Sequence, residues 1–270
     1  MIESDSGLLA AEAAVIEAID KWWVGEQSRL DGLKSTAQLV QLRQEFLKTF
    51  AAALEPTMML DRFQIDGTIA SWWGKALPDL KALATLGYKG LIDAWVSTVI
   101  DALSEEKAKI DPLEHKVAKA LLPEYLEGLA EMEVNVAALD STIKAATTSA
   151  DEEDDGADED VLSETEIKEL KKQLTAEKRK LKGERAAFGR RIAEAATQLS
   201  PGAAREVVLD ACGRDLRYEA GDRMVRHRKE VADAMGNWWA KYKVSMPEIE
   251  ASLAVARESF ALALKDPGYE

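Results

Sequence analysis

The sequence predicts an all-α protein: a helical bundle with a long helical-hairpin arm that resembles a coiled coil and is interrupted by an acidic disordered linker. Three observations predict it. Apolar residues recur at helical spacing along most of the 270 residues, no segment alternates convincingly between apolar and polar residues, and eight of the ten residues at 151–160 are Asp or Glu. Such a charged run repels itself and buries nothing, which indicates a solvated linker.

Residues 1–110 predict a helical subdomain. Helices are expected at about 8–23, at 36–54 before Pro56, and at 78–86. Residues 91–103 are apolar on more than one helix face, which indicates burial among other helices. The tryptophan pairs at 22–23, 72–73 and 238–239 are expected to anchor the core. Adjacent helix positions point about 100° apart, so a pair cannot easily form one stacking platform.

Residues 111–200 predict the helical-hairpin arm, with the acidic linker at 150–161. Asp111-Pro112 is typical of a helix start, and Ser163 with Glu166 is typical of a capping box. Six apolar or aromatic residues in the first half recur at steps of 4, 3, 4, 3 and 4, the spacing of a coiled-coil seam: Tyr125, Leu129, Met132, Val136, Leu139 and Ile143. The second half has a comparable stripe: Ile167, Leu170, Leu174, Leu181, Phe188 and Ala195. Two interpretations stay open, that the stripes close the hairpin on itself or that they leave a groove for helices of another chain.

Residues 201–270 predict C-terminal helices that pack back on the bundle. One helix is expected from Pro201 and another from about 222 to 239. Pro247 then opens a last helix with apolar residues at core spacing: Ile249, Leu253, Ala256, Phe260 and Leu264.

The residues predict no catalytic, cofactor-binding or metal-binding site. The sequence lacks a Gly-x-Gly-x-x-Gly loop, a Gly-x-x-x-x-Gly-Lys-Ser/Thr loop, a His-Glu-x-x-His pair and any Pro-Pro dipeptide. His115 and His227 are far apart and are expected in surface or structural roles. The single cysteine, Cys212, is expected to be an inert core residue. One cysteine, the lack of a secretory signal and the lack of a long apolar window together favour a cytoplasmic protein.

Charge gives one candidate surface. The net charge of -14 argues against a free-standing, non-specific nucleic-acid binder. Residues 168–191, however, hold ten basic residues against three acids. The favoured interpretation is a solvated flank of the coiled coil that the acidic linker partly neutralises, and the alternative is docking on an acidic partner or contact with phosphate. The candidates for phosphate contact are Lys178, Arg179, Lys182 and Arg185.

Several extended stretches resemble the C-terminal region of the modification (M) subunit of type I restriction–modification systems. They follow one another in the same order as in that family: RFQIDGTIASWWG at 62–74, LKALATLGYKGLIDAW at 80–95, PLEHKVAKALLPEYLEGL at 112–129, LSETEIKELKKQL at 162–174, HRKEVADAMGNWWAKYKVSMPEIEA at 227–251, and Gly268-Tyr269.

The resemblance implies part of a site-specific DNA adenine-N6 methyltransferase. In that family, two M subunits join one specificity subunit and use S-adenosylmethionine, which binds in a preceding catalytic domain with an Asn/Asp-Pro-Pro-Phe-type motif. That domain is missing from this sequence, so we expect no cofactor in this chain and no catalysis by the chain alone. The resemblance implies a helical assembly region, an excised fragment or a split-gene product, that docks the M subunit onto the specificity subunit, and through the complex onto DNA. The residues expected in partner binding or arm packing are Leu129, Met132, Val136, Leu139, Ile143, Leu170, Leu174, Leu181, Ile249, Leu253 and Phe260.

Two other functions remain open. The acidic charge would also suit a stand-alone interaction protein, or a decoy that occupies a restriction complex, and a neighbouring gene for the catalytic half would argue against both. An independent enzymatic activity would require binding of S-adenosylmethionine by the chain itself.

Overall fold

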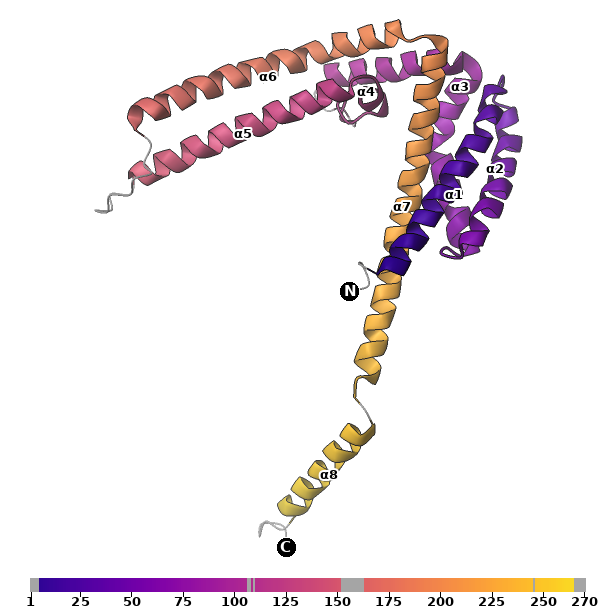
Figure 1. Cartoon of the computed structure of the whole chain (residues 1–270), viewed down its shortest axis with the longest axis vertical. Helices are drawn as coiled ribbons and strands as arrows, with labels where there is room; N and C mark the ends of the chain where they lie inside the picture. The colour runs from indigo at the N-terminus through magenta and orange to yellow at the C-terminus, as the bar shows by residue number, and fades with distance from the viewer. Residues whose placement is uncertain (1–4, 106–107, 109, 152–162, 245, 265–270) are drawn as a thin grey trace. The chain divides into compact units, whose positions relative to one another are not determined.

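The computed structural model describes residues 5–105, 108, 110–151, 163–244 and 246–264 (Figure 1). Within these ranges the ordered elements are helices and there is no strand, so the predicted all-α class is confirmed. The elements in chain order are α1 (Ser6–Asp31), α2 (Gln38–Leu54), the 3-10 turn η2 (Glu55–Thr57), α3 (Arg62–Ser104), α4 (Lys116–Leu121), α5 (Pro123–Asp151), α6 (Glu164–Gln198), α7 (Pro201–Tyr242) and α8 (Met246–Ala263). The predicted acidic linker falls almost entirely outside the described residues.

The chain divides into two compact units. The first comprises Met1–Val24, Phe46–Trp72 and Leu216–Glu270, and the second comprises Gly25–Glu45 and Trp73–Asp215. The division into 1–110, 111–200 and 201–270 stays a prediction.

An aromatic cluster forms the core of the first unit. The Trp22 ring meets the rings of Phe46 and Phe50 edge-on, with centroids 5.2 and 5.0 Å apart, and Trp23 meets Trp72 at 5.7 Å. Trp22 Nε1 donates a hydrogen bond to Thr49 Oγ1 over 2.9 Å, so the indole is buried without losing its polar partner. These edge-to-face contacts hold α1, α2 and the first turns of α3 together.

Polar pairs attach α7 to this core. The Arg228 guanidinium forms a two-pronged contact with the Glu12 carboxylate, and Ser71 Oγ donates to Glu219 Oε2 over 2.6 Å. Gln64 Nε2 lies 3.1 Å from His227 Nδ1, which gives this histidine the structural role expected for it. Because a guanidinium fork matches a carboxylate in only a few orientations, the Arg228 pair fixes the rotation of α7 as well as its position.

A charged network lies in the second unit. The Lys116 amine contacts Asp79 and lies 3.4 Å from the Asp215 carboxylate and 4.7 Å from the centre of the Trp95 ring. Trp95 Nε1 donates to Asp79 Oδ1 over 2.7 Å. Burial by itself would lower the pKa of Lys116, but the Asp79 and Asp215 carboxylates outweigh it and the pKa is raised. The amine therefore stays charged and ties α4 to α3 and to the start of α7.

Cys212 is buried in the same unit. Loss of solvent raises the pKa of its thiol to about 12, so the thiolate form needed for reactivity is scarce at neutral pH. The prediction that Cys212 is a core residue is confirmed.

Several predicted helix ends are wrong. Gly25 lies inside α1 and Pro78 inside α3, and the helices expected around 201 and at 222–239 are one helix, α7. The expected helix start at Asp111-Pro112 is a turn in which Asp111 Oδ1 accepts a hydrogen bond from the Leu113 amide. Glycine and proline inside a helix cost about 1 and about 3 kcal/mol relative to alanine, so packing of the surrounding helix outweighs these costs at Gly25 and Pro78.

The helices begin and break where side chains or backbone geometry require it. His115 Nδ1 accepts from the Val117 amide and caps α4, and Ser163 with Glu166 forms the predicted capping box of α6. α3 is interrupted at Gly87, whose φ of 72° and ψ of -179° are almost confined to glycine.

Candidate protein-interaction surfaces

The predicted arm is a hairpin of α5 and α6, which run side by side in Figure 1. The rings of Tyr125 and Phe188 stack with centroids 6.1 Å apart, and the Arg191 guanidinium lies 4.9 Å from the Tyr125 ring centre. The Tyr125 hydroxyl donates to the backbone oxygen of Glu184, and burial raises its pKa. These contacts fix how the two helices face one another at the base of the hairpin.

Most of the predicted seam lies between these two helices. Leu129 and Ile143 are buried, at 2% and 8% exposure. The other candidate residues of the arm are half-buried: Met132, Val136, Leu139, Leu170, Leu174 and Leu181. The arm residues therefore bury much of their apolar surface within the hairpin, as the first of the two open interpretations expected.

Ion pairs join the polar flanks of the hairpin. Lys178 Nζ lies 3.4 Å from Asp140 Oδ1, and Arg185 Nη2 lies 2.6 Å from Glu133 Oε1. Hydrogen bonds from Lys144 and then Lys178 lower the pKa of Asp140. Two of the four candidates for phosphate contact thus already have carboxylate partners in α5.

The other two candidates face solvent. Arg179 and Lys182 are exposed, and neither forms an ion pair with any residue that the structure describes. Of the four candidates on α6, two therefore form ion pairs with α5 and two form none with the described residues.

The last three predicted partner residues lie on α8 and are uncovered. Ile249, Leu253 and Phe260 are 49%, 48% and 67% exposed, and no described residue of α8 is buried. Met246, Ile249, Leu253, Ala256 and Phe260 share one helix face at steps of 3, 4, 3 and 4. The spacing read as core spacing in the sequence belongs to an apolar stripe that the described part of the chain does not cover.

The end of α7 carries a second uncovered stripe, which the sequence analysis missed. The pair Trp238 and Trp239, expected in the core, is 65% and 75% exposed, so that expectation is wrong for this pair. The pairs at 22–23 and 72–73 are buried as expected. Val231, Met235, Trp238 and Tyr242 follow one another at steps of 4, 3 and 4, a signal that could have marked this face.

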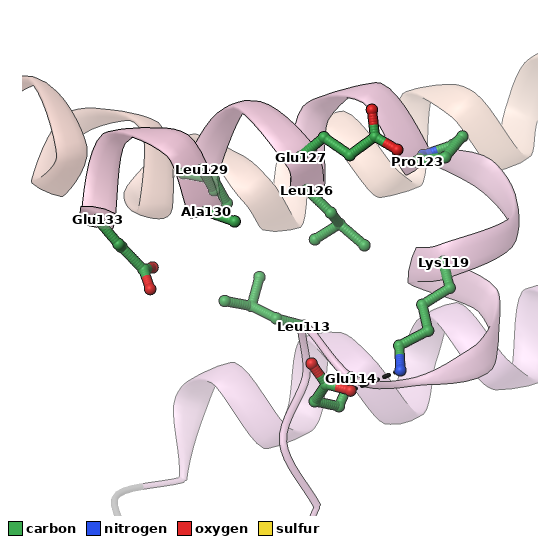
Figure 2. Close-up of a pocket in the computed structure, with 9 residues that line it drawn as sticks. All are labelled: Leu113, Glu114, Lys119, Pro123, Leu126, Glu127, Leu129, Ala130 and Glu133. Carbon is green, nitrogen blue, oxygen red and sulfur yellow. Dashed lines mark hydrogen bonds and ion pairs between the residues drawn. The ribbon is translucent and has the colours of Figure 1, made fainter. Parts of the chain in front are cut away.

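A shallow hollow of about 400 Å³ lies where the turn before α4 meets α5 (Figure 2). Leu113, Leu126 and Leu129 form its apolar part, and Lys119 pairs with Glu114 at its rim over 2.5 Å. No group of three or more His, Cys, Asp or Glu side chains in the described ranges is arranged to hold a metal ion. Acidic side chains also line the hollow, so its surface is mixed rather than purely apolar.

Among the helices that the structure describes, none is long and apolar enough to cross a membrane. Comparisons of the chain with protein-family models, with curated proteins and with solved structures found no match.

Proposed function

We propose that this chain is the helical assembly region of a type I restriction–modification adenine-N6 methyltransferase subunit, and that its last two helices dock on helices of the specificity subunit. The observation that carries the proposal is the pair of uncovered apolar stripes, at 231–242 on α7 and at 246–260 on α8. Soluble monomers rarely expose contiguous apolar surface of this kind, and such surface is typical of protein-interaction sites.

The geometry of the stripes supports a helical partner. Side chains at alternating steps of 3 and 4 present one narrow seam, and such a seam packs best against another helix. Trp238, Trp239 and Phe260 supply large aromatic anchors, which dominate binding energy in protein interfaces. The sequence stretch HRKEVADAMGNWWAKYKVSMPEIEA, one of those that resemble the M subunit, spans the α7 stripe and the start of α8.

The charges beside the α8 seam are mixed. At ~3.6 residues per turn, Glu250 and Arg257 flank the stripe, whereas Glu248 and Glu258 lie on the opposite side of the helix. The proposed docking therefore depends on apolar packing rather than on one sign of charge. The arm, in this proposal, is a rigid element of the subunit rather than its main docking surface.

S-adenosylmethionine and the flipped adenine belong, by the resemblance, to a catalytic region that this sequence does not contain. The contribution of the assembly region to methyl transfer is then positional. Reaction rates fall steeply when reacting atoms are misplaced by about an ångström, so a firm connection between the catalytic region and the DNA-reading subunit supports the rate.

Co-elution on size exclusion tests the proposal. The unmodified chain is mixed with a purified specificity subunit of the same system, and we expect one complex. An Ile249→Asp, Leu253→Asp variant is expected to lose the complex while keeping its helical circular dichroism, because both side chains are exposed in the free chain.

A matched control is available on exposed apolar residues elsewhere. Val24 and Val40 are each 68% exposed, and a Val24→Asp, Val40→Asp variant should still form the complex. Failure of the unmodified chain to associate would end the proposal. Loss of association in a Leu139→Asp, Leu174→Asp variant that stays helical would move the interface to the arm.

A further inference from the structure

The outer face of α6 carries a row of cations, which we name the basic ridge: Lys168, Lys172, Arg179, Lys182 and Arg190. At ~3.6 residues per turn these five positions fall within a sector of about 80° on the helix, turned away from the α5 seam. At ~1.5 Å per residue the ridge is ~33 Å long. All five side chains are exposed.

Within the part of the chain that the structure describes, the charges of the basic ridge are largely uncompensated. Lys168, Arg179 and Lys182 form no ion pair with the described residues, as noted for two of them above. The carboxylates nearest to Lys172 and Arg190 lie at 3.9 and 4.0 Å, and these two cationic side chains are 80% and 72% exposed. Contacts of that length and exposure contribute little, so the ridge keeps its positive field.

Two cations on the flank of α6 between the ridge and the α5 seam behave differently. Lys178 and Arg185 pair with Asp140 and Glu133 of α5 and are each 53% exposed. The hairpin therefore separates its cations into a neutralised set that joins the two helices and a free set that faces outward.

The residues between the cations of the ridge are small. Thr175, Gly183 and Ala186 occupy the same face, and Gly183 has open space where a side chain would begin. Stable protein interfaces need a buried apolar or aromatic centre, which this face lacks. A straight row of solvent-exposed cations is complementary to a polyanion whose charges repeat along a line. A DNA duplex is such a polyanion, with one phosphate charge per ~1.7 Å of its axis.

We propose that the basic ridge contacts the phosphate backbone of duplex DNA without reading its sequence. The choice of DNA over other polyanions rests on the proposed function, whereas the selection of the ridge rests on the ion-pair pattern of α6. The net charge of -14 repels DNA from the rest of the surface, so binding by the chain alone is weak and confined to this face. In a complex, such contacts orient the protein along the duplex while other groups read the bases.

The chain offers two closely matched variants for the test. Arg179→Gln with Lys182→Gln removes two ridge charges, and Lys178→Gln with Arg185→Gln removes one arginine and one lysine from the paired set on the same helix. Binding of the full chain to a fluorescent duplex of about 30 base pairs is followed by anisotropy over a range of salt concentrations. We expect the ridge variant to bind about tenfold more weakly, with a salt slope smaller by about 1.8, because each phosphate contact contributes about 0.9 to that slope.

The paired-set variant should stay within about twofold of the unmodified chain, since its cations are already neutralised. Equal losses in the two variants would overturn the proposal, because net charge alone would then explain binding. Absence of salt-dependent binding by the unmodified chain would also overturn it, as would tighter binding to poly-glutamate than to the duplex, which would indicate an acidic protein partner.

Co-elution with the specificity subunit separates this inference from the proposed function. If the ridge variant loses DNA affinity but still forms the complex, both stand. If the unmodified chain binds DNA through the ridge but forms no complex, the assembly role fails and the ridge remains. If it forms the complex without any ridge-dependent DNA binding, the ridge proposal fails alone.

Discussion

The arm of α5 and α6 and the C-terminal segment at 231–264 carry the same kind of apolar stripe with opposite outcomes. In the arm, Leu129 and Phe188 are 2% and 0% exposed, whereas in the C-terminal segment Leu253 and Phe260 are 48% and 67% exposed. Apolar and aromatic side chains recur at helical steps of 3, 4 or 7 in both regions. The pattern therefore predicts a helix with one apolar face but does not identify what covers that face.

The difference follows from what each region contains. In the arm, each helix covers the apolar face of the other, because α6 runs back along α5. Ion pairs between the two helices, such as Arg185 with Glu133, fix their register. Most helix stability in proteins comes from packing of an apolar face, so a helix whose face is uncovered depends on a partner outside itself. The apolar face of the arm is thus covered within the hairpin, whereas the apolar face of the C-terminal segment is available to a partner.

The largest expected contrast comes from one substitution made in both regions. Phe188→Ala should lower the free energy of unfolding by about 3–5 kcal/mol, because it leaves a cavity beside Tyr125. Phe260→Ala should change it by less than about 0.5 kcal/mol, because the ring is mostly solvated already. Urea unfolding monitored by circular dichroism measures both, and equal effects would show that α8 is covered in solution.

Hydrogen exchange tests the same contrast without substitutions. Amides of α8 should open with a free energy below about 1.5 kcal/mol, since a helix of 18 residues with no buried side chain is marginal by itself. Amides of α6 near Phe188 should require more than about 3 kcal/mol, because opening there exposes the buried seam. Addition of the specificity subunit should protect α8 and leave α6 unchanged. Strong protection of α8 in the free chain would contradict the description of an uncovered face.

A smaller loss of stability is expected when the hydroxyl of Tyr125 is removed. Tyr125→Phe removes the hydrogen bond to the backbone oxygen of Glu184 and keeps the ring stack on Phe188, so the loss should be about 1 kcal/mol. Thermal unfolding of the variant measures it. Tyr242→Phe, at a side chain 68% exposed in the C-terminal segment, is the control and should have no measurable effect. A stability equal to that of the unmodified chain would mean that the hydroxyl bond adds nothing to the arm.

The smallest expected effect is the loss of arm stability at low pH. The pKa of Asp140 is lowered by its hydrogen bonds to Lys144 and Lys178, so the folded arm binds a proton less readily than the unfolded chain does. This contribution is present above a pH of about 4 and disappears as the pH falls through the lowered value. Exchange of α5 amides should therefore increase more between pH 6 and pH 3, after correction for intrinsic rates, than it does in an Asp140→Asn variant. An identical increase in exchange in the Asp140→Asn variant would show that the ion pairs of Asp140 do not stabilise the arm.

The sequence predicted the all-α class, the hairpin arm, the capping box at Ser163 and the buried thiol of Cys212. Each depends on local information, namely spacing, a cap or the absence of alternation. It did not predict that Pro78 lies inside α3, that His115 rather than Asp111 caps α4, or that Trp238 and Trp239 are exposed. Those outcomes depend on which faces meet after folding, and local preferences, about 1 kcal/mol or less for most residues and about 3 kcal/mol for proline, do not contain that information.

For the candidate surfaces, the sequence by itself determined which residues share a helix face and where positive charge accumulates. Only the tertiary structure decided that, among the described residues, Leu129 is covered while Leu253 is not, and Lys178 is paired while Arg179 is not. The physical reason is that spacing fixes an angle around one helix axis. Burial and ion pairing depend on a second helix, whose position the spacing does not contain.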